Sequence, residues 1–280
     1  MKFLFPLLLL LTLSACSKTD TISEEELVMT EPALEILLDQ WQAILDTARL
    51  DGSILLFNPQ EGRYYSNDFS NVRQGSLPAS TFKIPNSIIA LETGVVEDDS
   101  TLFSWDGSPR GMVIWEQDLI FRQAFQFSCV PCYQEVARRI GADRMNEYLE
   151  RLDYGQMNVD SSNIDLFWLE GSSTISPWEQ IDFLQRLYQG ELPISERTLE
   201  IIQRMLLIEE TPHYRLSGKT GWAIREGHNT GWFVGYAERE GSVYFFATRV
   251  VPQEGRPMTD FARARRAVSE EALELYFNLF

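Results

Sequence analysis

Residues 78–86 read Pro-Ala-Ser-Thr-Phe-Lys-Ile-Pro-Asn, and the apolar run that begins within them stops before Gly94. This pattern predicts a helix with Pro85 in its first turn, where no intrahelical N–H is needed. Ser80 would then lie at the helix N-terminus, with Lys83 one turn further on and on the same face. A hydroxyl, an amine and the free N–H groups of the first turn would lie together, which is how a serine nucleophile is activated.

The Ser80-x-x-Lys83 pair is a weak signal by itself, because both residue types are common. The alternative is a helix N-cap serine followed by a lysine on the surface. Phe82 and the apolar residues after it favour an enclosed Lys83 instead, and a buried amine loses its proton readily. The pair is therefore a candidate nucleophile and base whose role depends on what the rest of the chain supplies.

The composition is that of a globular protein. The chain has 280 residues, of which 44% are hydrophobic, and its 17 Phe, 10 Tyr and 7 Trp suffice for a large core. The net charge of −17 would repel phosphate backbones, so we expect no nucleic-acid partner. An anionic substrate remains compatible with this charge if the site itself is locally basic.

The first 15 residues have the pattern of a targeting segment. Residues 3–13 are apolar but too few to span a bilayer, and Leu-Ser-Ala-Cys at 13–16 resembles a bacterial lipoprotein signal. We expect residues 1–15 to be a signal peptide, Cys16 to be lipidated, and residues 16–32 to be an acidic tether. The protein would then be periplasmic and anchored to the outer membrane. An unanchored periplasmic protein is the alternative.

Two further cysteines, Cys129 and Cys132, could form a small disulfide in an oxidising compartment. Closing so short a loop adds little stability through chain entropy. A thioredoxin-like redox site is the sharper interpretation of Cys-x-x-Cys, but no βαβ pattern surrounds this one. A zinc site is also disfavoured, because there is no second cysteine pair and His213 and His228 are the only histidines. We expect no metal site.

Strand patterns lie at both ends of the chain, with helical patterns between them. Near the N-terminus we expect a helix over residues 34–50 and a hairpin over residues 54–65. Residues 94–212 read as mainly helical, and a closing helix is expected over residues 259–280. Three strand-like runs form an expected antiparallel meander, over residues 213–224, 230–237 and 242–252. The fold class predicted is α+β, with one antiparallel sheet built from both chain ends, flanking helices and an inserted helical lobe, in one catalytic domain over residues 33–280.

Three more motifs follow the Ser80 segment in a fixed order. They are Ser128-Cys129-Val130 in a loop, Tyr154-Gly155-Gln156 between helices, and Lys219-Thr220-Gly221-Trp222 on a predicted strand. Each is weak alone, but in this order and at these separations they form the pattern of the penicillin-recognising serine enzymes. From about residue 33 to the C-terminus, the chain resembles the class D (oxacillinase-type) β-lactamases, and Phe167-Trp168-Leu169-Glu170-Gly171 resembles the family's tryptophan loop.

The chain departs from the family pattern at two places. The family more often has Asn where Gln156 stands, and a cysteine pair such as Cys129 and Cys132 is not a general family feature.

The resemblance implies a serine β-lactamase that confers antibiotic resistance and takes β-lactams as its small-molecule partners. It implies an acyl-enzyme on Ser80 and a Lys83 that is N-carboxylated by carbon dioxide or bicarbonate and serves as the general base, with no other cofactor. Ser128 would pass a proton to the leaving nitrogen, and Val130 and Trp168 would enclose the carbamate, Trp168 by donating its indole N–H.

The resemblance also implies the groups that bind the substrate. The backbone N–H groups of Ser80 and Trp222 would form the oxyanion hole beside Gly221. Three side chains would hold the substrate carboxylate, namely Lys219, Thr220 and Arg265. Arg265 is the best match to the family's C-terminal arginine, within a cluster that also holds Arg263 and Arg266.

Other functions compete with hydrolysis. A β-lactam sensor acylates without turnover, but such receptor domains usually follow several membrane helices. A peptidoglycan D,D-peptidase has the same motif order and a different substrate. The tryptophan loop and Phe82, between Ser80 and Lys83, favour the hydrolase. A non-enzymatic lipoprotein scaffold would not need this set of motifs.

Overall fold

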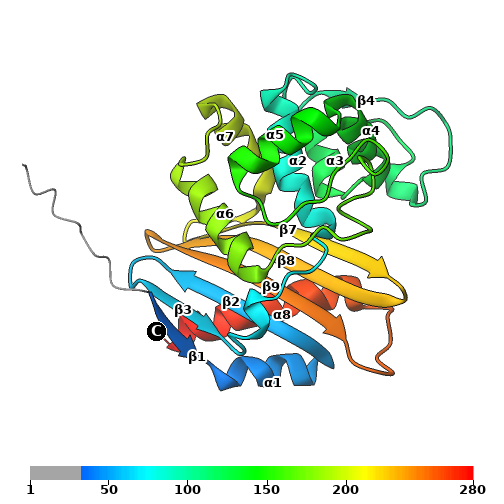
Figure 1. Ribbon diagram of the computed structural model, residues 1–280. Helices are drawn as coiled ribbons and strands as arrows, with labels where there is room; N and C mark the ends of the chain where they lie inside the picture. The colour runs from blue at the N-terminus through cyan, green and yellow to red at the C-terminus, as the bar shows by residue number, and fades with distance from the viewer. Residues whose placement is uncertain (1–32, 280) are drawn as a thin grey trace, which may run out of the picture. The chain divides into compact units, whose positions relative to one another are not determined.

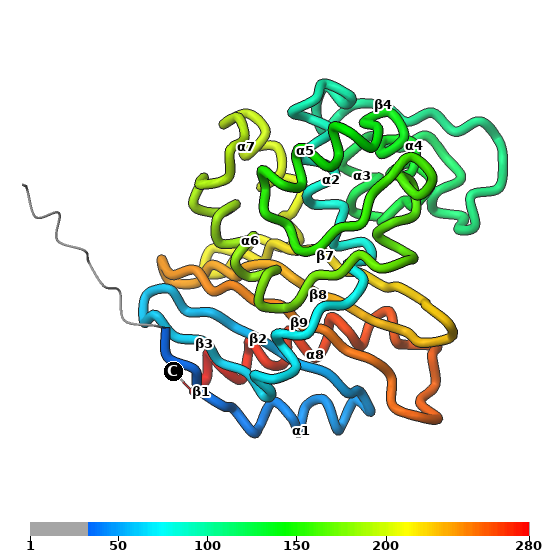
Figure 2. The backbone as a smooth tube through the Cα atoms, viewed as in Figure 1, coloured from blue at the N-terminus to red at the C-terminus, as the bar shows by residue number. Residues whose placement is uncertain are grey.

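A seven-stranded sheet separates two layers of helices in the computed structural model, which describes residues 33–279 (Figure 1). The strand order is β1-β3-β2-β9-β8-β7-β6, so β2 from near the N-terminus lies beside β9 from near the C-terminus (Figure 2). The strands are β1 (Leu34–Leu37), β2 (Leu50–Asn58), β3 (Arg63–Ser66), β6 (Leu207–Glu210), β7 (Tyr214–Arg225), β8 (His228–Arg239) and β9 (Ser242–Pro252). The predicted sheet made from both ends of the chain is confirmed.

The pairing is antiparallel except at one edge of the sheet. β7, β8 and β9 form the predicted meander, and β2 and β3 form the predicted hairpin, whereas β1 pairs with β3 in parallel. The prediction of one helix over residues 34–50 was therefore wrong at both ends, because helix α1 spans only Asp39–Thr47 and Leu50 begins β2. The spacing of Leu34 and Leu37 fits a helix, but in β1 both side chains are exposed, and the parallel pairing with β3 holds this segment as a strand.

Helices cover both faces of the sheet. α1 and α8 (Phe261–Leu279) lie on one face, and the inserted lobe lies on the other (Figure 1). The lobe contains α2 (Lys83–Glu92), α3 (Phe121–Gln126), α4 (Val130–Ile140), α5 (Ala142–Leu152), α6 (Pro177–Gln189) and α7 (Glu196–Leu206). Its short elements are η1 (Asn71–Arg73), η2 (Ala79–Phe82), η3 (Val113–Trp115) and the strand pair β4 (Leu102–Phe103) and β5 (Leu119–Ile120). The predicted insertion of a helical lobe is confirmed.

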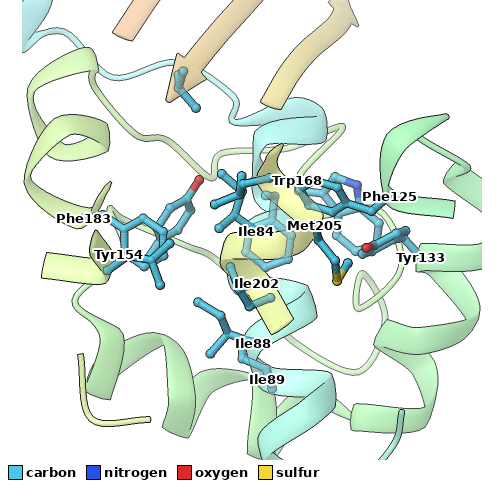
Figure 3. Packing of buried hydrophobic residues seen from close by; sticks show 14 of the residues in the cluster. Ile84, Ile88, Ile89, Phe125, Tyr133, Tyr154, Trp168, Phe183, Ile202 and Met205 are labelled. Carbon is cyan, nitrogen blue, oxygen red and sulfur yellow. The ribbon is translucent and has the colours of Figure 1, made fainter. Parts of the chain in front are cut away.

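The sheet carries a separate core on each face because strand side chains alternate. In β8, Trp232 and Val234 belong to the core under the lobe, and Phe233 between them belongs to the core under α1 and α8. Helix α2 lies in the middle of the lobe core, where Ile84, Ile88 and Ile89 contribute (Figure 3). Every α2 residue before Glu92 is buried. A lysine that begins such a helix has little access to water.

Helix α6 begins with a capping box that fixes its direction on the sheet. Ser176 Oγ accepts a hydrogen bond from Glu179 N, and the Glu179 carboxylate accepts one from Ser176 N. Pro177 occupies the first helical position, where its missing N–H has no cost. This start places Gln180, one turn into the helix, inside the core.

The expected signal peptide, the lipidation of Cys16 and the tether of residues 16–32 lie outside the described residues. Within residues 33–279, no helix combines the length and the apolar character needed to cross a membrane.

Candidate active site

Ser80 and Lys83 lie together at the start of α2, as the segment around them predicts. Ser80 lies in the 3-10 turn η2, which runs directly into the α-helix, and Pro85 is the third residue of that helix. Lys83 Nζ donates a hydrogen bond of 3.1 Å to Ser80 Oγ. Lys83 is only 1% exposed, and Ser80 is only 7% exposed. A nucleophile and a potential base are thus in direct contact in a nearly dry site.

Burial dominates the chemistry of Lys83. Loss of hydration lowers the pKa of its amine from 10.5 to about 7. The Tyr133 ring lies 5.0 Å from Nζ, and the Tyr133 hydroxyl is hydrogen-bonded to Ser87 Oγ at 2.7 Å. A ring face favours the cation, but the burial outweighs it. Near neutral pH, roughly half of the Lys83 side chains are therefore uncharged amines.

Strand β7 approaches the Ser80 turn closely at Gly221. A Cβ atom at this position would lie 3.1 Å from Pro78 O and 3.2 Å from Thr81 Cγ2. Any side chain here would push the strand away from the turn. The glycine of Lys-Thr-Gly therefore allows β7 to pass close to the Ser80 turn at Pro78 and Thr81.

Ser128 and Lys219 are joined across the site. Ser128 follows α3 and has a left-handed backbone with φ of 53°. Lys219 Nζ, from β7, donates to Ser128 Oγ at 2.5 Å and to Thr220 O at 3.0 Å. Burial, together with the positive charges of Lys83 and Arg265, holds the pKa of Lys219 well below its usual range. When protonated, this amine can therefore readily return a proton to the Ser128 oxygen once that oxygen has given up its own.

Trp168 packs against the Ser80 turn. Its carbonyl accepts a hydrogen bond of 2.9 Å from Ala79 N, and its ring stacks on Phe82 at 5.5 Å between centroids. The indole Nε1 is buried and has no hydrogen-bond partner among the described residues. This donor is therefore available to a water or a group bound in the site.

Arg265 is hydrogen-bonded to β7. It donates from NH1 to Gly221 O at 2.8 Å, and its guanidinium lies 5.7 Å from the Trp222 ring. Its Nε is buried and has no partner among residues 33–279, and burial lowers its pKa to about 10. Arg263 is exposed, and Arg266 is paired with Glu270 at 2.7 Å.

The Tyr154-Gly155-Gln156 motif has a structural place. The Tyr154 ring is buried, and burial raises the pKa of its hydroxyl above the usual range. A Cβ atom on Gly155, whose φ is 57°, would lie 2.7 Å from Thr174 O. Gln156 exchanges backbone hydrogen bonds of 2.8 Å with Thr174. These bonds are made by the backbone, so Gln in place of the family's Asn leaves them intact.

Cys129 and Cys132 are joined by a disulfide, with Cα atoms 5.4 Å apart. Both residues are buried in the lobe core, unlike the attacking thiol of a thioredoxin-like site. His213 and His228 are exposed on the β7–β8 side of the sheet. Val130, between the cysteines, is half-buried at the first position of α4.

Two residues of the site were missed from sequence. Gln180 donates to Thr81 Oγ1 at 2.9 Å and to the Tyr154 hydroxyl at 3.2 Å, which ties α6 to the Ser80 turn. No local pattern marks this contact, because the partners are 99 and 26 residues away. Tyr133 could have been found, since it follows Val130 by three residues on the apolar face of α4.

The geometry suits acyl transfer to an anionic substrate. A serine contacts an amine of lowered pKa, and a second serine contacts another such amine. A glycine of β7 brings two backbone segments together where an oxyanion could bind, and an arginine adds positive charge at the same strand.

Several known proteins are similar to this chain along most of its length. A family model described as a penicillin binding protein transpeptidase domain matches residues 52–273. β-Lactamase OXA-48 from Klebsiella pneumoniae is 39% identical over 84% of this chain and 86% of its own. β-Lactamase OXA-10 from Pseudomonas aeruginosa is 41% identical over 74% of this chain and 79% of its own. The crystal structure of a class D β-lactamase from Nostoc matches with a TM-score of 0.79 and 43% identity, covering 84% of this chain and 97% of that one.

Proposed function

Because this chain belongs to the class D serine β-lactamases, we propose that it hydrolyses β-lactam antibiotics through an acyl-enzyme on Ser80 and so confers resistance to them. The observation that carries the proposal is the contact between Ser80 Oγ and the amine of a buried Lys83. A lysine in water is protonated at neutral pH and cannot accept the serine proton. The enclosed amine can be neutral, so it can react further or act as a base.

The residues around Lys83 fit a carbamate formed with carbon dioxide. The amine is uncharged often enough to react, and the unpaired Nε1 of Trp168 is a donor for a carbamate oxygen. Tyr133 and Val130 add apolar walls that keep water away. When formed, the carbamate supplies a carboxylate-like general base for both acylation and deacylation. An aspartate or glutamate at this position could not provide the same reach from the start of α2.

We assign the acylation step to four side chains and two backbone groups. Ser80 Oγ loses its proton to the modified Lys83 and bonds to the lactam carbonyl carbon, and the carbonyl oxygen is stabilised by the N–H groups of Ser80 and Trp222. The C–N bond of the ring then breaks. Ser128 gives its proton to the leaving nitrogen and recovers one from Lys219, whose low pKa favours the transfer. The proton held by the modified Lys83 is then returned to Lys219, which restores both groups. A water gives a proton to the modified Lys83 as its oxygen bonds to the ester carbon, and the ester C–O bond breaks as Ser80 Oγ takes that proton.

The pH dependence follows from Lys83. Its pKa of about 7 means that the amine is neutral above this pH and charged below it. Carbon dioxide reacts only with the neutral amine, so activity should be lost as the pH falls through 7. Between pH 7 and pH 6, the neutral fraction falls about fivefold.

We therefore expect kcat for a chromogenic cephalosporin to fall severalfold between pH 7 and pH 6, and added bicarbonate to restore part of it. The measurement is initial rate against pH at several bicarbonate concentrations, in degassed buffer. A rate that is independent of bicarbonate at every pH would contradict the carbamate.

Arg265 and Thr220 would bind the carboxylate of the substrate together with Lys219. Arg265→Ala should raise KM for benzylpenicillin about tenfold to a hundredfold, because a hydrogen bond to a charged group is worth about 1.5–3 kcal/mol. The methyl ester of the same penicillin, which lacks the charge, should be hydrolysed alike by both proteins.

The matched control is Arg263→Ala, on the same helix but exposed. Equal effects of the two arginine changes, or an equal loss with the methyl ester, would mean that Arg265 only supports β7.

We also propose that Cys16 is lipidated and anchors the protein in the periplasm, on the outer membrane. The proposal rests on the Leu-Ser-Ala-Cys sequence at 13–16 after an apolar run. Palmitate labelling of the full chain in a Gram-negative host should disappear in Cys16→Ala. Labelling that persists in this variant would refute the proposal.

A further inference from the structure

The Cys129–Cys132 disulfide lies at the start of α4, in a short segment that borders the active site. Ser128 immediately precedes it, and Val130 lies between the two cysteines at the first position of α4. Tyr133, whose ring faces Lys83, immediately follows it. The disulfide is therefore next to Ser128, which contacts Lys219, and next to Tyr133, whose ring lies beside Lys83.

The backbone of Ser128 is one that a serine does not adopt freely. Its φ of 53° lies in the left-handed region, where the Cβ of an L-residue is crowded. Such a conformation persists only where the surrounding structure imposes it. On the α3 side, Ser128 N donates to Phe125 O at 3.1 Å, and Cys129 N donates to Ala124 O at 2.8 Å.

On the α4 side, the disulfide holds the turn. Cys129 is the N-cap of α4, and its Sγ accepts from Cys132 N at 3.3 Å. An N-cap is normally Ser, Thr, Asp or Asn, whose oxygen accepts strongly, whereas sulfur is a weak acceptor. The covalent bond between the two cysteines therefore holds the first turn of α4, which in other helices is held by a strong capping hydrogen bond.

Breaking this link would change the geometry of the turn more than the stability of the protein. A loop of this size contributes little chain entropy. Without the covalent bond, the first turn of α4 would be held at Cys129 only by a weak N–H···S hydrogen bond of 3.3 Å, and by none in an alanine variant. Ser128, whose hydroxyl Lys219 holds at 2.5 Å, would then be free to leave its left-handed conformation.

We propose that the Cys129–Cys132 disulfide positions Ser128 for proton delivery to the leaving nitrogen, so that the oxidised protein is the fully active form. The proposal rests on the function proposed above, since it assigns the disulfide to one step of that reaction. Reduction by dithiothreitol would break the S–S bond, add two electrons and two protons to give two thiols, and convert the reductant to its cyclic disulfide.

The test compares a substrate that needs the Ser128 proton with one that does not. A penicillin expels a nitrogen that must be protonated, whereas an activated aryl ester of phenylacetylglycine expels an aryloxide that leaves without a proton. In the full-length Cys129→Ala/Cys132→Ala variant, Ser80 acylation by the penicillin should slow about tenfold, since misplacement by about 1 Å can cost up to about 10²-fold. Acylation by the ester should stay within about twofold.

Two controls separate positioning from general loosening. Ile140→Val alters the other end of α4, where the side chain is buried, and should leave both acylation rates unchanged. The wild-type protein, reduced to an extent measured by mass after alkylation, should reproduce the double variant and recover on reoxidation. Reduction and reoxidation of the wild-type protein still test the proposal if the double variant does not fold. The double variant itself should not respond to dithiothreitol.

Unchanged penicillin acylation after loss of the disulfide would overturn the proposal. Equal slowing with both substrates would also overturn it, because the disulfide would then have only a structural role. If wild-type protein formed no adduct with the penicillin, the function proposed above would fail instead.

Discussion

Replacing Lys83 by alanine is expected to lower β-lactam turnover by at least about 10³-fold, since a positioned general base is worth about 10²–10⁴ in each step that uses it. Lys83 Nζ is the amine in contact with Ser80 Oγ, and its carbamate would serve both acylation and deacylation. Losing the base in acylation has a different consequence from losing it in deacylation. Slow acylation can still be driven by excess substrate, but slow deacylation leaves the adduct in place. The variant should therefore accumulate acyl-enzyme.

The matched variant is Lys83→Met, which keeps most of the side-chain volume in the buried α2 position. It should behave like Lys83→Ala, and bicarbonate should rescue neither. The measurement combines steady-state hydrolysis with intact mass after mixing with a penicillin. Turnover by either variant within about tenfold of wild type would show that another group is the base.

Ser80→Ala should abolish covalent labelling by penicillin, because Ser80 Oγ accepts the hydrogen bond from Lys83 Nζ and lies in the turn that β7 approaches at Gly221. Ser128 Oγ contacts Lys219 instead, and the role proposed for it is proton transfer to the leaving nitrogen. Loss of the nucleophile removes the covalent route entirely, and residual hydrolysis would come only from oxyanion and binding groups. We expect a fall of at least about 10⁴-fold in kcat.

The matched control is Ser53→Ala, a buried serine of β2 whose hydroxyl has no partner within residues 33–279. It should label at the wild-type rate. The assay is mass spectrometry of the protein after a penicillin chase, with the adduct located by peptide mapping. An adduct on the Ser80→Ala protein would refute the assignment of the nucleophile.

Sequence predicted the parts of the fold and site that are encoded locally. The Ser80 segment predicts its own helix because Pro85 and the apolar run restrict where the helix can begin. The strand runs after residue 212 predict β7 to β9, because adjacent strands joined by tight turns pair with each other. The contact between Ser128 and Lys219 is not local, because they are 91 residues apart, and it is expected only from the resemblance to a known family.

The parts that were missed depend on contacts between distant segments. Residues 34–37 became a strand because β3 offers a free edge, which no local pattern shows. Gln180 contacts the Ser80 turn because α6 crosses the sheet beside it. The left-handed backbone of Ser128 is likewise set by its neighbours and not by a serine's own preference.

A locally basic site would let an acidic protein bind an anion. The chain has a net charge of −17, yet Lys219 and Arg265 both contact groups of β7 at the site. Burial, with repulsion from Lys83 and Arg265, lowers the pKa of Lys219, whereas Arg265 with a pKa of about 10 stays charged at neutral pH. Arg265 would therefore supply the lasting positive charge beside a bound carboxylate.

The most direct test of the acyl-enzyme mechanism is an intact-mass time course of the full chain mixed with a limited excess of benzylpenicillin, with and without bicarbonate. We predict one adduct of the penicillin mass on Ser80, which decays to free enzyme as hydrolysed penicillin appears, and which decays faster with bicarbonate. An adduct that persists at every bicarbonate concentration would contradict this mechanism and would identify a sensor or a D,D-peptidase instead.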